Sequence, residues 1–162
     1  MSYFAAALAR TPDGWTAEEL DLDGVSDVDE VADLVRDVGS EAGPALLFVE
    51  EDDEYVAILR VDADVDEPRV FVSDAAAAAT YPVAGILAGA VDDPAVADAD
   101  GEDSPTPVGE PLGDAGLLSD LGTSRRDLLT LINSGRTLPA DVISEVCERA
   151  GCLDELETLR GT

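Results

Sequence analysis

Histidine and lysine are both absent from the 162-residue sequence, and all nine basic residues are arginine. Without histidine the chain cannot form a Ser-His or Cys-His nucleophile, and it lacks the commonest general base and metal ligand. Without lysine it cannot form a Schiff base. The sequence also lacks the P-loop, the G-x-G-x-x-G pattern and the G-x-S-x-G pattern. We therefore expect no catalytic residue, no cofactor and no enzymatic activity.

Cysteine and long apolar runs are also scarce. The two cysteines, Cys147 and Cys152, are too few for a disulfide framework and have the wrong spacing for C-x-x-C. We expect two reduced thiols packed as small hydrophobes, with a redox pair as the alternative. No apolar run approaches the roughly 20 residues that span a bilayer, and the start of the chain lacks the basic region of a signal peptide. These features predict a cytoplasmic protein.

Negative charge dominates what is present, with a formal net charge of −28. A surface this acidic repels phosphate groups, so we expect no direct binding to nucleic acid. Three interpretations of the charge stay open. It serves solubility, it attracts a basic partner protein, or it mimics nucleic acid in a regulator.

The local basic feature of the sequence consists of Arg125, Arg126 and Arg136. These arginines either pair with neighbouring acids such as Asp127 on a helix surface, or they contact an acidic partner or a phosphate. We take them as candidate partner-contact residues.

Acidic clusters raise the alternative of a carboxylate-only, metal-dependent enzyme. The stretch Asp62-Ala-Asp64-Val-Asp66 starts like a calcium-binding loop. However, Glu67 stands where the loop requires glycine, and Ser73 stands where it requires a bidentate glutamate. We therefore expect no metal site.

Strand signals are concentrated between Ala45 and Val72, where three short runs rich in β-branched and aromatic residues predict an antiparallel meander. The run Ala45–Val49 is almost continuously apolar, which predicts a central strand covered on both faces. The next run alternates toward Arg60, which predicts a strand that becomes more exposed near its end. Earlier in the chain, Thr11-Pro12-Asp13-Gly14 predicts the turn of a hairpin between residues 3–9 and 15–21.

Helix signals follow these strands. Asp27 and Glu30 have the spacing of a capping box before an amphipathic helix over Val28–Val38. The small apolar run Val83–Val91 fits either a strand or a buried helix. Short helices are predicted over residues 112–121 and 125–133, from Pro139 to an end near Gly151, and around Leu153, Leu156 and Leu159. They either pack on the sheet or stand apart from it.

The sequence thus predicts an α+β fold, a mainly antiparallel sheet with one or two packed helices. The α+β domain spans residues 1–91, an acidic flexible linker spans 92–111 and a small C-terminal helical segment spans 112–162. The linker assignment depends on composition, because this stretch is rich in Asp, Pro and Gly and has little to bury.

The order of several stretches along the chain is informative. They are Tyr3-Phe4-Ala5-Ala6-Ala7, the Ala45–Val61 hairpin with its acidic turn, the acidic linker, and a closing block that runs from Gly116-Leu117-Leu118-Ser119-Asp120-Leu121-Gly122 through Leu138-Pro139-Ala140-Asp141 to Ala150-Gly151-Cys152. This order resembles a family of actinobacterial tRNA adenosine deaminase-associated proteins over nearly the whole chain. The family is named for genes that lie beside a tRNA adenosine deaminase gene.

The resemblance implies association with a tRNA adenosine deaminase or with its pathway. From it we expect a non-catalytic accessory protein that acts through protein–protein binding. The chain is not the deaminase itself. Zinc deaminases carry an H-x-E motif and a P-C-x-x-C motif. This chain has no histidine, and Cys147 and Cys152 have the wrong spacing.

Overall fold

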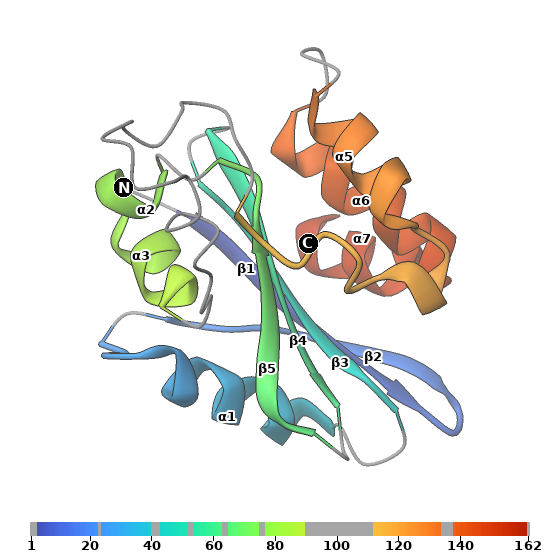
Figure 1. Ribbon diagram of the computed structural model, residues 1–162. Helices are drawn as coiled ribbons and strands as arrows, with labels where there is room; N and C mark the ends of the chain where they lie inside the picture. The colour runs from blue at the N-terminus through green and yellow to red at the C-terminus, as the bar shows by residue number, and fades with distance from the viewer. Residues whose placement is uncertain are drawn as a thin grey trace.

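A hairpin, a three-stranded meander and a returning strand build one sheet of six strands in the order β2-β1-β3-β4-β5-β6, and all neighbouring pairs are antiparallel. The computed structural model describes residues 3–22, 24–39, 43–51, 54–62, 65–74, 77–89, 112–133 and 138–161. The strands are β1 (Tyr3–Thr11), β2 (Gly14–Glu19), β3 (Ala45–Glu51), β4 (Tyr55–Asp62), β5 (Val65–Val72) and β6 (Leu112–Gly113). Helices cover both faces of this sheet (Figure 1), which confirms the predicted α+β fold.

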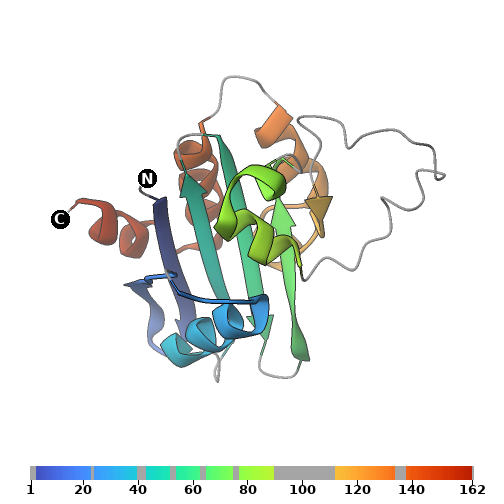
Figure 2. The same ribbon diagram turned by 90° about the vertical axis from the view of Figure 1, so that its left-hand side faces the viewer.

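The helices form two groups. The first group contains α1 (Val28–Gly39), α2 (Ala77–Thr80) and α3 (Pro82–Ala88). The second contains α5 (Arg125–Asn133), α6 (Pro139–Ala150) and α7 (Leu153–Gly161), preceded by a 3-10 turn, η1 (Ser119–Leu121). Figures 1 and 2 show the first group on one face of the sheet and the second group on the other.

Strand β3 shows how the sheet serves two cores at once. Successive side chains of a strand point to opposite faces. Leu47 and Val49 therefore join the cluster under the first group of helices, while Leu46 and Phe48 join the cluster under the second. All four are fully buried. This confirms the prediction of a central strand covered on both faces.

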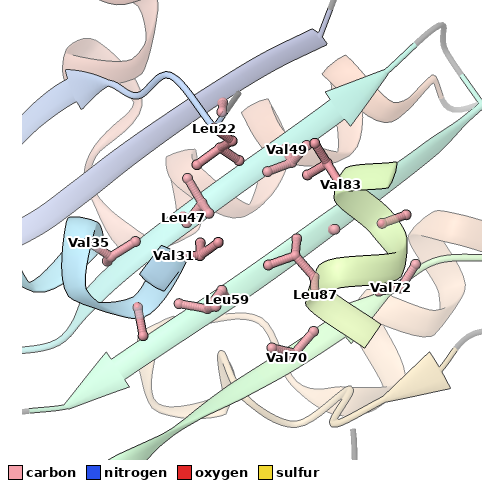
Figure 3. Packing of buried hydrophobic residues seen from close by; sticks show 14 of the residues in the cluster. Leu22, Val31, Val35, Leu47, Val49, Leu59, Val70, Val72, Val83 and Leu87 are labelled. Atoms are coloured by element: carbon pink, nitrogen blue, oxygen red, sulfur yellow. The ribbon is translucent and has the colours of Figure 1, made fainter. Parts of the chain in front are cut away.

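The first core lies between the sheet and α1 and α3, as Figure 3 shows. Val31 and Val35 of α1 pack there with Leu87 of α3. The start of α1 is capped as predicted, since the Glu30 N–H donates to Asp27 Oδ1 at 3.0 Å. The Glu30 carboxylate in turn accepts from the backbone N–H one residue before the cap, at 2.6 Å. This double cap satisfies two backbone donors that would otherwise lack partners at the helix start.

The second core lies between the sheet and α5, α6 and α7. Ile143, Val146 and Cys147 of α6 share one buried cluster with Phe48 and with residues of β1, β4 and β5. The C-terminal helices therefore pack on the sheet. The predicted linker at 92–111 lies outside the described residues, and the domain boundaries at 91 and 112 stay a prediction.

The structure decides one segment that the sequence left open and contradicts the prediction for another. The undecided run after Tyr81 is the helix α3, which starts at Pro82. The helix predicted over residues 112–121 is wrong, because Leu112–Gly113 pairs with β5 and η1 follows. Gly113 has φ +99°, and a Cβ at that position would lie 2.1 Å from the Val70 carbonyl oxygen. A glycine is required for this close approach of two backbones, and a helix pattern cannot signal it.

No helix in the described ranges is long and apolar enough to cross a membrane.

Candidate partner-binding surface

The arginines predicted to contact a partner lie at the start of α5. Ser124 caps this helix, since its Oγ accepts from the Asp127 N–H at 3.1 Å. Arg125 and Arg126 are exposed on the first turn. Asp127 does not pair with them, because its carboxylate contacts Arg149 Nη1 at 3.0 Å. Across the described ranges, neither Arg125 nor Arg126 forms an ion pair, so both guanidinium groups are available to an acidic group.

The position of Arg125 and Arg126 costs stability. Cations at a helix N-terminus oppose the helix dipole, typically by about 0.3–1 kcal/mol each. This cost is a physical reason to look for a function at this position, and the role of Arg125 and Arg126 as contact residues stays a hypothesis. Arg136, the third predicted member, lies outside the described residues.

A second arginine feature is buried and was not predicted. Arg60 of β4 is 6% exposed. The alternation of apolar and polar residues had predicted that β4 becomes more exposed toward its C-terminal end, and that prediction is wrong. Its guanidinium donates to both carboxylate oxygens of Asp120, at 2.6 and 2.9 Å. It also donates to the Leu117 carbonyl at 2.6 Å and to Asp62 Oδ1 at 3.1 Å. The planar fork of arginine suits this bidentate arrangement.

Arg69 of β5 extends the same contact. Its Nη2 donates to the Leu117 carbonyl at 3.1 Å, and its Nε lies 3.7 Å from Asp114 Oδ2. Two arginines from neighbouring strands therefore hold the segment 114–120 on the sheet. We name Arg60, Arg69, Asp62, Asp114, Asp120 and the Leu117 carbonyl the Arg60 network. It anchors the C-terminal part of the chain and is a structural site.

One sequence signal could have revealed the Arg60 network. Arg60 stands alone between Leu59 and Val61 in an otherwise apolar strand, and a charge inside a buried strand requires a partner. Asp62 is the near partner and could have been proposed. Asp120 is 60 positions away, so no local pattern could identify it.

The Arg60 network predicts a pH dependence of stability. Hydrogen bonding from Arg60 holds the pKa of Asp120 below its ordinary value, and partial burial opposes this shift. A carboxyl group whose pKa is lower in the folded state stabilises the fold above its unfolded pKa of about 3.9 and loses this contribution as the pH falls through the folded value. Asp120→Asn should therefore destabilise the protein at pH 7, and the difference from wild type should shrink below about pH 4.

Urea unfolding of both proteins from neutral to acidic pH measures this difference. Asp37→Asn is the matched control, because Asp37 is exposed on α1 and has no ion pair among the described residues. A difference between wild type and Asp120→Asn that stays constant with pH would contradict the assignment.

Two exposed acidic residues lie next to each other on β2. Glu18 and Glu19 are both exposed there, and they point to opposite faces of the sheet. Beside Glu19 lie two shallow hollows. One is lined by Phe4, Glu50, Ala140 and Leu159, and the other by Tyr3, Leu20 and Asp21. We name β2 with Glu18 and Glu19 the acidic edge.

Of the stretch that resembles a calcium-binding loop, residue 64 lies outside the described residues. Asp62, the first residue of the loop that resembles a calcium site, is engaged by Arg60. Cys147 and Cys152 are both buried in the second core, and neither forms a disulfide. Within the described residues no three His, Cys, Asp or Glu side chains gather as a metal ligand set.

A comparison with known proteins found one family. The family model is described as Rv3753c-like tRNA adenosine deaminase-associated protein, and it matches residues 3–153 of this chain. The match includes the sheet and the Arg60 network, and it extends to the first residue of α7. No curated protein and no solved structure matches the chain.

Proposed function

Because the chain belongs to the family of Rv3753c-like tRNA adenosine deaminase-associated proteins, we propose that it is a non-catalytic accessory protein that binds a tRNA adenosine deaminase. The family match over residues 3–153 is the observation that carries this proposal. The family name supports association with the deaminase. Binding as the mode of association is our inference.

Charge supports binding to an enzyme that recognises tRNA. A protein that binds tRNA needs a basic surface, because it must replace the counterions of the phosphates. The chain carries a net charge of −28, and its acidic edge presents two exposed carboxylates on one strand. Opposite charges of this size steer two proteins together and raise the association rate more than they set the affinity.

The residues favour an accessory role over a second catalytic role. Deamination by a zinc enzyme requires an activated water on zinc and a glutamate that transfers protons. With no histidine in the sequence, the chain cannot supply the H-x-E motif. Its two thiols are buried in the second core. In this proposal the chemistry belongs to the deaminase.

A regulator that mimics nucleic acid is the second candidate, and the same net charge of −28 favours it. Such a protein would occupy the basic surface that tRNA uses. The two candidates differ in one observable. A plain accessory protein leaves tRNA binding intact, whereas a mimic competes with tRNA for the deaminase.

We expect the purified chain to bind the tRNA adenosine deaminase of the same organism. The affinity should fall about tenfold when ionic strength rises from about 0.05 M to about 0.15 M, because salt screens exposed charges beyond about 8 Å. Isothermal titration calorimetry at both salt concentrations measures this. A repeat with tRNA already bound to the enzyme separates the accessory protein from the mimic.

No heat of binding at the lower salt concentration, for a deaminase that still binds tRNA, would refute the proposal. An affinity that does not change with salt would retain the accessory role and remove the electrostatic explanation.

A further inference from the structure

Strand β2 is an open edge of the sheet. Its six residues pair with β1 on one side, and it is the terminal strand of the sheet order. The register with β1 is continuous from Glu19 to Gly14, without a bulge. Figure 1 shows β2 at the margin of the sheet, beside α7.

Two backbone hydrogen bonds identify the groups of β2 that point outward. The Leu20 N–H donates to the Ala5 carbonyl at 2.9 Å, on the side of β1 that faces β2. The Arg10 N–H donates to the Pro44 carbonyl at 3.1 Å, on the side of β1 that faces β3. In an antiparallel pair, residues that exchange hydrogen bonds alternate with residues that do not. The N–H and C=O groups of Trp15, Ala17 and Glu19 therefore point away from β1, toward the open side of β2.

Edges of this kind are usually protected. Natural proteins shield them with short strands, charged side chains, proline, a bulge or a covering element. Strand β2 has no proline and no bulge, and its charged side chains are Glu18 and Glu19. No backbone hydrogen bond from another described segment reaches Trp15, Ala17 or Glu19 on their outward side. The opposite edge strand, β6, has two residues and is too short to accept a strand of ordinary length.

The side chains along this edge are suited to a basic segment. Glu18 and Glu19 flank it on both faces of the sheet. The helix α7, which contacts β2, carries the exposed acidic residues Asp154 and Glu157. The hollow beside Glu19 includes the apolar side chain of Phe4. Two neighbouring residues of an added strand would meet Glu18 and Glu19, one on each face of the sheet, and the residues opposite Trp15 and Ala17 would meet less polar surface.

We propose that the acidic edge accepts an extended, lysine- or arginine-bearing segment of the deaminase, which adds to β2 as a seventh strand. This inference rests on the proposed function and names the place and mode of binding. Backbone hydrogen bonds to Trp15, Ala17 and Glu19 supply affinity, and Glu18 and Glu19 select a basic sequence. A second copy of this chain is disfavoured as the occupant, because each copy carries a net charge of −28.

Amide hydrogen exchange by NMR tests the proposal on the unmodified chain. In the free protein, the outward amides of Trp15, Ala17 and Glu19 should exchange fast. Those of Thr16 and Glu18, which face β1, should exchange slowly. When the deaminase is added, exchange at the outward three should slow by at least about tenfold. The inward amides serve as the internal control.

A pair of matched charge variants tests the selection. Glu18→Gln with Glu19→Gln should weaken deaminase binding about tenfold. Asp37→Asn with Glu148→Gln removes the same charge from exposed positions on α1 and α6, and it should weaken binding no more than about twofold.

The outcomes separate the two proposals. If the deaminase binds while the outward amides keep their free exchange rates, docking on β2 is refuted and the accessory role survives. If the deaminase does not bind at all, the proposed function fails, and docking on β2 fails with it. In the absence of the deaminase, the same amides could instead become more protected as the concentration of this protein is raised. That result would assign the edge to a second copy and overturn the inference.

Discussion

Replacing Arg60 with alanine is expected to lower the free energy of unfolding by about 2–3 kcal/mol. Arg60 is 6% exposed and holds both oxygens of Asp120 together with the Leu117 carbonyl. Its removal leaves the Leu117 carbonyl with Arg69 as its remaining donor and returns the Asp120 carboxylate to water. The variant also leaves an unfilled volume between β4 and the segment 114–120.

Arg60→Met separates these two causes. Methionine fills part of the volume without a donor, and Asp120 is 63% exposed, so its carboxylate can return to water. We expect Arg60→Met to cost about 1–2 kcal/mol, less than alanine. Chemical unfolding measures both losses, and faster amide exchange at Leu117–Leu121 would locate them. A cost below about 1 kcal/mol for alanine would show that the Arg60 network is not an anchor.

Phe48→Ala is expected to lower the free energy of unfolding by about 3–5 kcal/mol. Phe48 is 1% exposed in the middle of β3, within the cluster that joins the sheet to the C-terminal helices. Truncation removes the transfer free energy of a benzyl group and leaves a cavity that the surrounding strands cannot close. A domain of this size has about 5–15 kcal/mol in total, so the loss is a large fraction of its stability.

The matched controls for Phe48→Ala lie on the other core and on the surface. Leu47→Ala, one residue earlier, empties a site under α1 and α3 and should cost about 2–5 kcal/mol. Leu138→Ala should change stability by less than about 0.5 kcal/mol, because Leu138 is 51% exposed. Exchange rates of α6 amides should rise more in Phe48→Ala than in Leu47→Ala. Equal rates in both variants would contradict the division into two cores.

Short-range patterns predicted the elements whose causes lie within a few residues. The hairpin turn at Thr11–Gly14, the double cap before α1 and the two-sided strand β3 are all present. Each depends on local dihedral angles, on a hydrogen bond over three or four residues, or on the alternation of side chains. The predicted helix over residues 112–121 was wrong because the pairing of Gly113 with Phe71 is a long-range event.

The candidate site was predicted in part. Arg125 and Arg126 are exposed and unpaired among the described residues, as a contact role requires, and that role stays a hypothesis. The acidic edge was not predicted, since Glu18 and Glu19 are two of 37 acidic residues with no distinguishing local pattern. Their significance comes from the place of β2 in the sheet order.

The sequence alone determined what chemistry this chain cannot perform, since the absence of histidine and lysine does not depend on folding. It also determined the α+β class, because its apolar residues recur every two residues in the strands and every 3.6 residues in the helices. The tertiary structure alone decided that Arg60 is buried against Asp120 and that β2 is an open edge. Both depend on contacts between segments far apart in the chain. Such contacts stabilise the fold only after the sheet has brought these segments together.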